Sequence, residues 1–316
     1  MLRYLFGRLV QSLVLLMLVS VIGFFVLHLA PGGPLSQFVA IPGMTAAELE
    51  RISTQMGLNR PLPIQYVSWV EKMLTGDWGQ SYRDSTPVLE VIGSHLGATV
   101  LLMVSATLIA VVVGCWIGIR SAVRQYSVFD YITTVIAMIA LSIPTFWFGL
   151  VGIYIFSLKL GWLPPGNMYT IGDETILNYA KHLIMPSLVL ALVHLAVWSR
   201  YMRSATLEIL NQDYIRTARA KGMSARRVIA RHVLRNAMLP MIALAGLELP
   251  TLLSGALVTE TVFTWPGMGR LFLDSLSYKD YPVIMGLLMF SAILVVVANL
   301  VADIMIAIAD PRIRHA

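Results

Sequence analysis

The sequence predicts an all-α integral membrane protein with six transmembrane helices, both termini in the cytoplasm and a small external cap between the first two helices. Hydrophobic residues make up 57% of the 316 residues and charged residues only 13%, which leaves too little polar surface to cover a water-soluble globule. The mean hydropathy is +0.75. Six apolar stretches also approach or exceed the ~20 helical residues that a ~30 Å hydrocarbon core requires.

The six stretches are spread along the whole chain. They cover residues 9–30, 96–119, 131–158, 182–199, 236–259 and 281–302. The first is longer than the apolar core of about 7–15 residues in a signal peptide, and no cleavage site follows it, so we expect a retained helix. The fourth is short and carries Pro186 and His194, and the fifth is interrupted once, at residues 248–250.

Basic residues indicate how these helices are oriented. Of the 23 lysines and arginines, 15 lie on the side of the two termini, and nine of those fall within residues 200–235. Because basic residues concentrate in cytoplasmic loops, we expect both termini in the cytoplasm. The net charge of +6 is then a consequence of topology, and nothing in it calls for a nucleic-acid partner.

This topology divides the chain into four parts. We expect a first transmembrane helix at 1–30, an external (periplasmic) cap at 31–95, a five-helix core at 96–309 with a cytoplasmic loop at 200–238, and a cytoplasmic tail at 310–316. In the cap, Thr45 followed by Glu48 predicts a capped helix start, and residues 64–74 predict a second helix. The cap is either a packed loop that stabilises the bundle or a ligand-binding element.

The long cytoplasmic loop has the pattern of two short amphipathic helices. Apolar or small residues recur in it at helical spacing: Ile215, Ala218, Gly222, Ile229, Val233 and Leu234. Gly222 can end the first helix, Ser224 can cap the second, and Pro240 marks the return to the membrane. Such a basic pair either lies on anionic lipid or docks a cytoplasmic partner.

Residues 214–222 (YIRTARAKG) and Leu239-Pro240 resemble the "EAA" loop of permease subunits of bacterial ABC importers. Arg216 and Thr217 stand where the superfamily motif has Glu and Ala.

The resemblance extends over essentially the whole chain. Segments at 29–32, 61–66, 76–79, 143–147, 160–164, 260–267 and 310–314 are similar, in this order and spacing, to the first, B-type permease of the dipeptide/oligopeptide/nickel branch. Gly33 replaces an acidic residue that is common in that branch.

The resemblance implies the fold of a type I ABC importer permease that forms half of a translocation pore in the bacterial inner membrane. It implies as partners a homologous second permease, two cytoplasmic ATPase subunits (or a heterodimer of them), an external substrate-binding protein and the lipid bilayer. The ATPase-coupling residues would be Ala218, Arg219, Ala220, Lys221, Gly222, Met223, Ser224, Arg226 and Arg227.

The sequence itself carries no site for ATP chemistry. It has no GxxxxGK[ST] loop, so a P-loop that cradles phosphates is missing. We therefore expect a non-catalytic subunit without a cofactor of its own, with ATP and Mg²⁺ on the partner ATPase subunits.

Several polar, proline and aromatic residues of the apolar stretches are candidates for the translocation path. Glu248 lies within the fifth stretch, where a carboxylate is costly, so it lines a cavity, makes a structural hydrogen bond or couples protons. The candidate path residues are Glu248, Ser254, Thr259, Pro144, Phe146 and Trp147. His28 and His194 are interpreted as packing residues, and no pair of histidines or cysteines has metal-site spacing.

Other functions follow from other interpretations of the same residues. A proton-coupled secondary transporter would use Glu248 as its relay. An intramembrane enzyme is disfavoured because no Gly-x-Ser-x-Gly or HExxH motif is present. Among importer cargoes, the sequence does not separate dipeptides, oligopeptides, glutathione-like compounds and metal chelates.

Overall fold

The computed structural model describes residues 2–29, 33–39 and 43–309. Within these ranges, side chains are described except at 2–6, 36–37, 239, 243, 246–255 and 305–309. Regular structure in the described ranges is helical. The chain divides into two compact units, one within 1–97 and 270–297 and the other within 98–269 and from 298 on, and each is described by itself.

The first unit combines long apolar helices with the segment expected to form the cap. Its elements are α1 (Leu2–Leu29), η1 (Gly33–Leu35), α2 (Ser36–Val39), α3 (Ala46–Gln55), α4 (Leu62–Leu74), the first turns of α5 (Val88–Val123), most of α12 (Met268–Tyr278) and most of α13 (Tyr281–Ala309). The two helices expected in the cap are therefore present as α3 and α4.

Local chemistry explains where α3 begins. The Thr45 hydroxyl accepts the Glu48 amide at 3.3 Å, and the Glu48 carboxylate accepts the Thr45 amide at 2.9 Å. This reciprocal pair satisfies two amides that have no partner inside the helix. The predicted helix start is thus confirmed.

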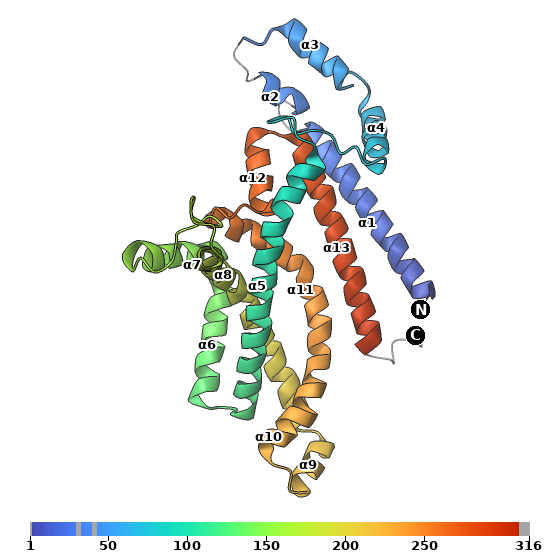
Figure 1. The fold of residues 1–316 in the computed structure, drawn as a ribbon. Helices are drawn as coiled ribbons and strands as arrows, with labels where there is room; N and C mark the ends of the chain where they lie inside the picture. Colours follow the sequence, from blue (N-terminus) through green and yellow to red (C-terminus); the bar gives the residue numbers. More distant parts are fainter. Residues whose placement is uncertain (1, 30–32, 40–42, 310–316) are drawn as a thin grey trace. The chain divides into compact units, whose positions relative to one another are not determined.

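The second unit is a helical bundle built around α8. Its elements are the rest of α5, α6 (Val128–Ser142), α7 (Thr145–Gly152), the π-helix η2 (Ile153–Lys159), α8 (Ile176–Leu210), α9 (Asp213–Ala220), α10 (Ala225–Val228), the π-helix η3 (Ile229–Val233) and α11 (Leu234–Val262). Helix α8 packs against α6, α7 and α11. Figure 1 shows α9 and α10 together beyond one end of α8.

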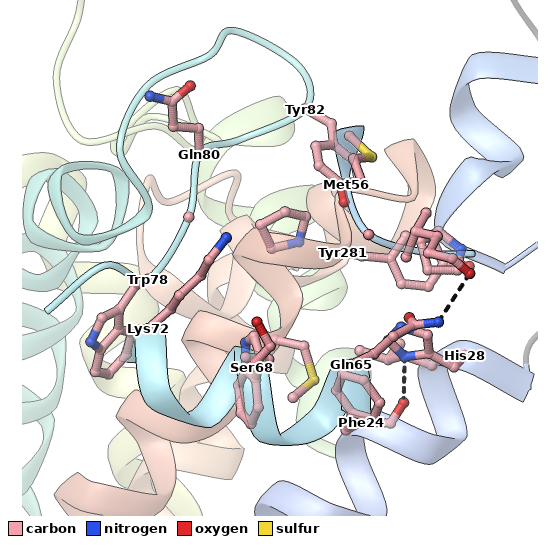
Figure 2. A pocket seen from close by; sticks show the side chains of 18 of the residues that line it. Phe24, His28, Met56, Gln65, Ser68, Lys72, Trp78, Gln80, Tyr82 and Tyr281 are labelled. Carbon is pink, nitrogen blue, oxygen red and sulfur yellow. Dashed lines mark hydrogen bonds between the residues drawn. The ribbon is translucent and has the colours of Figure 1, made fainter. Parts of the chain in front are cut away.

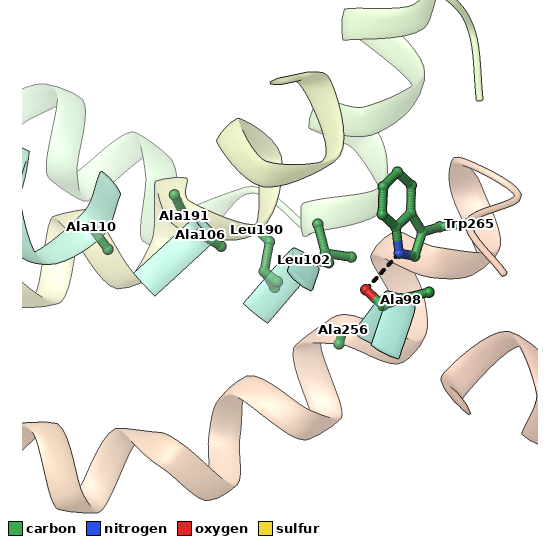
Figure 3. Close-up of a cluster of buried hydrophobic side chains, with 8 residues drawn as sticks. All are labelled: Ala98, Leu102, Ala106, Ala110, Leu190, Ala191, Ala256 and Trp265. Atoms are coloured by element: carbon green, nitrogen blue, oxygen red, sulfur yellow. Dashed lines mark hydrogen bonds between the residues drawn. The ribbon is translucent and has the colours of Figure 1, made fainter. Parts of the chain in front are cut away.

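The core of this bundle uses small residues to bring helices close together. Four residues of α5 meet residues of α8 and α11 and the loop after α11 (Figure 3): Ala98, Leu102, Ala106, Ala110, Leu190, Ala191, Ala256 and Trp265. The Trp265 indole donates to the Ala98 carbonyl at 2.9 Å, so the polar edge of this buried ring is satisfied.

Two glycines continue this close contact along α5. A Cβ added at Gly118 would lie 2.6 Å from the Ser199 carbonyl oxygen and 2.7 Å from the Met202 Cβ atom, and one at Gly114 would lie 2.9 Å from the Trp198 Cβ atom. The spacing of these two glycines is the small-xxx-small pattern of membrane helix pairs. Only glycine at both positions permits this separation of α5 and α8.

Apolar length identifies candidate membrane-spanning helices. Within the described residues, four helices are long and apolar enough to cross a membrane: 7–29, 88–123, 176–210 and 281–304. A fifth candidate is the pair formed by 128–142 and 145–159. The expected fifth stretch, 236–259, lies in α11, where many side chains are outside the described set.

The stretch expected to span the membrane at 131–158 is not one straight helix. The helix breaks after Ser142, and its two parts are bent by 104°. Ile143 adopts φ −98° and ψ 133°, the extended conformation that a following proline favours, and Pro144 supplies no amide for the ladder. Helix α6 therefore ends here and α7 starts in a new direction.

Pro240, expected to mark the return to the membrane, does not begin a helix, and the interruption of the apolar run at residues 248–250 is not a break in the backbone. Helix α11 runs without a break from Leu234 to Val262, and α10 and the π-helix η3 lead directly into it. Pro240 is therefore inside a helix rather than at its start. A proline removes one donor, and membrane helices tolerate this where local adjustments satisfy the freed carbonyl.

Candidate functional site

The basic loop folds into a helical elbow, which we define as residues 213–233. Helix α9 ends at Lys221, Gly222 takes the left-handed backbone conformation with φ +79°, and α10 starts after Ser224. Glycine adopts this conformation without strain, which confirms Gly222 as the junction. Ser224 occupies the capping position with extended backbone, but its side chain makes no capping hydrogen bond.

One side of the elbow is a small apolar core. Ile215, Ala218, Val228 and Val233 are buried together, with Ile209, Leu210 and Met223 packed around them. Of the residues that helical spacing placed on the inward faces, Ile215, Ala218 and Val233 are buried as predicted, whereas Gly222 and Leu234 are exposed and Val228 takes a core position instead. Ala218 is only 8% exposed, so it supports the elbow from inside and offers little surface to a partner.

The other side of the elbow is exposed and basic. Its solvent-facing residues are Arg219, Ala220, Lys221, Gly222, Ser224, Arg226 and Arg227. Met223 is half-buried between the two sides. A Cβ atom added at Gly222 would meet no other atom within 4 Å, so the tip of the turn is open. The elbow therefore presents a cationic, unobstructed ridge on a rigid base.

An ion pair braces α8 just before the elbow. The Arg203 guanidinium donates to both carboxylate oxygens of Asp130, at 2.7 and 2.8 Å. The Tyr126 amide donates to the same carboxylate at 3.0 Å, and the Asp130 side chain is 4% exposed. This bidentate geometry fixes orientation as well as distance. It ties the start of α6 to α8 seven residues before α8 ends.

A second polar cluster lies at the end of α11. The Glu260 side chain is fully buried, and its carboxylate accepts the Thr99 hydroxyl at 2.6 Å and the Gly269 amide at 2.7 Å. The Thr99 hydroxyl oxygen in turn accepts the Met268 amide at 2.8 Å. The cluster thereby fastens the end of α11 and the first residues of α12 to α5.

The sequence arguments did not single out Glu260 or the glycine pair. The position of Glu260 at the end of an apolar run, followed by glycines at 267 and 269, could have indicated its buried role. The Gly114-x-x-x-Gly118 spacing was a signal for the glycine pair.

The candidate path residues lie around the start of α7 and within α11. Pro144, Phe146 and Trp147 are exposed at the start of α7, and Thr259 is 1% exposed near the end of α11. The side chains of Glu248 and Ser254 are outside the described set. Among the described side chains, no group of three His, Cys, Asp or Glu residues is arranged to hold a metal ion.

Comparison with known proteins decides the family. The family model described as binding-protein-dependent transport system inner membrane component matches residues 110–315, and the model of its N-terminal part matches residues 1–103. The chain belongs to this family. It is therefore a multi-pass inner membrane permease, and the predicted resemblance to importer permeases is confirmed.

Relatives of the permease match it from end to end. It is 44% identical to the oligopeptide transport system permease protein AppB of Bacillus subtilis (strain 168), over 100% of both chains. It is 38% identical to the glutathione transport system permease protein GsiC of Salmonella typhi, again over 100% of both. The dipeptide transport system permease protein DppB of Escherichia coli (strain K12) is 34% identical, over 100% of the permease and 99% of its own length.

A solved structure shares the fold. A chain from the inward-facing MetNI methionine ABC transporter matches the permease with a TM-score of 0.57 at 18% identity, over 70% of the permease and 97% of that chain. Family and fold together favour a permease subunit of an ABC importer over the proton-coupled alternative.

Proposed function

We propose that the permease forms half of the translocation pore of an ATP-driven importer of short peptides. Its relatives are named as oligopeptide, dipeptide and glutathione permeases, which supports this cargo class. A homologous second permease would complete the pore, and an external binding protein would deliver the peptide. The permease itself would be non-catalytic and without a cofactor, with ATP and Mg²⁺ on two cytoplasmic ATPase subunits.

The observation that carries this proposal is the two-sided elbow. Its buried core holds the α9–α10 turn in one shape, and its basic ridge is open for a partner. We infer that this ridge sits in a groove on one ATPase, which requires the elbow and both termini to be cytoplasmic. The concentration of basic residues at 200–235 supports that orientation.

Shape would matter more than charge in this contact. Exposed ion pairs contribute only about 0–1 kcal/mol each, so the arginines of the ridge attract the ATPase but do not fix the position of the elbow on it. The fixed turn at Gly222 and the apolar core below it supply the register. Because α8 enters the elbow and α10 leads directly into α11, closure of the ATPase pair would tilt two membrane helices together.

Glu248, Ser254, Thr259, Pro144, Phe146 and Trp147 remain the proposed contributors to the path. The bend at Pro144 supports this part of the proposal, because it exposes the Phe146 and Trp147 rings at 48% and 46%.

A bulky residue at the tip of the elbow tests the docking role. We expect Gly222→Leu to reduce cargo-stimulated ATP hydrolysis and peptide uptake about 5- to 100-fold, because an inserted side chain in a close contact costs about 1–3 kcal/mol. Co-purification with the second permease checks that the variant folds. The readouts are both rates in proteoliposomes that contain the whole transporter.

The matched control is Gly172→Leu. Gly172 also has a left-handed backbone, with φ +90°, and open space around its Cα atom, so it carries the same backbone strain outside the elbow. We expect this variant to transport normally. Normal transport by Gly222→Leu would contradict the proposal that the elbow docks on an ATPase.

Lipid binding is the competing role for the basic ridge. If the ridge only rests on anionic lipid, the double variant Arg226→Glu/Arg227→Glu will change lipid binding or topology and leave ATPase association intact. Under the docking proposal, the same variant weakens ATPase association. Pull-down of the ATPase subunits, alongside flotation with anionic vesicles, separates the two roles.

The cargo is tested on the assembled transporter. We expect dipeptides or oligopeptides to stimulate ATP hydrolysis in the presence of the binding protein. Stimulation by a metal chelate alone would contradict the peptide assignment.

A further inference from the structure

The first unit contains a cavity of about 610 Å³ that the coupling mechanism does not use. It lies among α1, the turn between α3 and α4, α4, the loop before α5 and the start of α13 (Figure 2). Pockets that bind small ligands commonly measure about 300–1,000 Å³. All of its lining residues belong to this one unit.

Part of the lining is aromatic and deeply buried. Phe24, Tyr281 and Met285 are 3%, 8% and 5% exposed. The ring of Trp69 lies 5.9 Å from the ring of Phe24, and Trp78 also lines the cavity. Trp69 and Trp78 are half-buried, so their rings offer flat apolar surface for a large apolar side chain, whereas Phe24, Tyr281 and Met285 belong to the closed part of the wall.

The rest of the lining carries charge of both signs. Arg60 and Lys72 contribute cations, and Asp77 contributes a carboxylate. Figure 2 shows the Lys72 side chain rising from α4 between Trp78 and Tyr281. Both cations are exposed, and neither forms an ion pair with another of the described residues. Two such cations are suited to binding a carboxylate.

The cavity is held open by hydrogen bonds in its walls. The Gln65 amide nitrogen donates to the carbonyl oxygens of Leu58 and Arg60, at 3.0 and 2.7 Å, which fixes the turn between α3 and α4. On the opposite wall, the Ser81 hydroxyl and the Tyr82 amide both donate to Asp280. A preformed site loses less entropy when it binds a ligand.

Tyr82 adds a polar but uncharged group to the cavity. Burial, together with the nearby charge of Asp280, raises the pKa of Tyr82 to about 12, so its phenol stays uncharged. Asp77 uses one carboxylate oxygen to accept the Gly79 amide at 3.0 Å, and as an anion it can still attract an ammonium group.

We propose that this cavity is a binding site for short zwitterionic peptides with a large apolar side chain, distinct from the translocation path. The aromatic rings take the side chain, Arg60 and Lys72 bind the terminal carboxylate, and Asp77 binds the terminal ammonium group. The inference rests on the proposed peptide cargo. A lipid fits less well, because an acyl chain needs a continuous apolar channel, whereas Gln65, Ser68 and Ser81 interrupt this lining.

Photocrosslinking tests the site in the complete transporter. The probe is a tripeptide of p-benzoylphenylalanine between two alanines, added to the permease pair and its ATPases in lipid nanodiscs without the binding protein. We expect crosslinks, mapped by mass spectrometry, at residues 55–82. Blocking both termini of the probe by acetylation and amidation should reduce labelling about tenfold, because the charged contacts are lost.

Variants of the lining separate binding from general damage. Lys72→Met should reduce labelling about tenfold, Lys72→Arg should retain it, and Trp69→Ala should weaken it. The matched control is Lys181→Met, which removes an exposed lysine of the other unit. Co-purification of the second permease verifies that each variant assembles.

Several outcomes would overturn the proposal. One is labelling by the blocked tripeptide that equals labelling by the unblocked one, and another is labelling of Lys72→Met that equals labelling of the unmodified permease. The others are crosslinks confined to segments outside residues 55–82 and the absence of crosslinks. Labelling of the cavity by a photoreactive phosphatidylglycerol that excess tripeptide does not displace would assign it to lipid instead. Peptide uptake through the binding protein, measured in parallel, distinguishes failure of the cavity proposal from failure of the proposed peptide cargo. Uptake without cavity labelling overturns only this inference, whereas absence of uptake for every peptide overturns the proposed cargo.

Discussion

Glu260 is a residue whose surroundings fix the shape of a loop. Its two carboxylate oxygens accept hydrogen bonds from Thr99 and Gly269, and its backbone carbonyl accepts the Trp265 amide at 2.8 Å. A buried carboxylate is retained in an apolar setting only when such donors compensate for its lost hydration. The side chain thus links α5 to the start of α12.

Replacing the Glu260 carboxylate with an amide should destabilise the permease. We expect Glu260→Gln to lower the free energy of unfolding by about 1–3 kcal/mol, because one oxygen acceptor is replaced by an amide that cannot accept. Thermal unfolding of the purified permease in detergent measures the loss. Thr261→Val is the control, since the Thr261 hydroxyl bonds only within its own helix. Equal unfolding temperatures for Glu260→Gln and the unmodified permease would contradict this role.

At the scale of elements, the contact between α5 and α8 depends on a missing side chain. We expect Gly118→Ala to destabilise the permease by about 1–3 kcal/mol, because the new methyl group meets the α8 backbone. Gly97→Ala in the same helix has open space and should be neutral or stabilising by about 0.5–1 kcal/mol. Thermal unfolding of the two variants side by side is the measurement, and identical shifts would disprove the close-contact argument.

Elements governed by local chemistry could be predicted from the sequence. The start of α3 follows from Thr45 and Glu48, which are three residues apart, and the inward face of α9 follows from the spacing of Ile215 and Ala218. In both cases the interacting groups are neighbours in the chain. The local sequence pattern is then nearly sufficient to predict the start or the inward face of the helix.

Elements governed by distant partners could not be predicted. Pro144 ends a helix with a 104° bend, whereas Pro186 lies inside the continuous helix α8. Proline removes the same donor in both places, so neighbouring helices decide whether the helix continues. Glu260 is similar, because its partner Thr99 is 161 residues away in the sequence, and no local pattern indicates that the two meet.

At the scale of the whole molecule, the orientation in the membrane can be tested through the single cysteine. Cys115 is buried, so Cys115→Ala supplies a cysteine-free background. In that background, we expect Glu50→Cys in the cap to react with a membrane-impermeant maleimide added to spheroplasts. We expect Ser224→Cys in the elbow to react only after the membrane is opened. Labelling of Ser224→Cys from outside would invert the proposed topology.

The brace between Arg203 and Asp130 gives α8 the geometry of a lever. At 1.5 Å per residue, this 35-residue helix is about 52 Å long. The clamped point lies about 10 Å from the end at Leu210 and about 40 Å from the end at Ile176. A rigid rod that pivots at such a point moves its long arm about four times as far as its short arm, in the opposite direction. If α8 pivoted at this ion pair as a rigid rod, a displacement of about 1 Å at Leu210 would correspond to about 4 Å at Ile176.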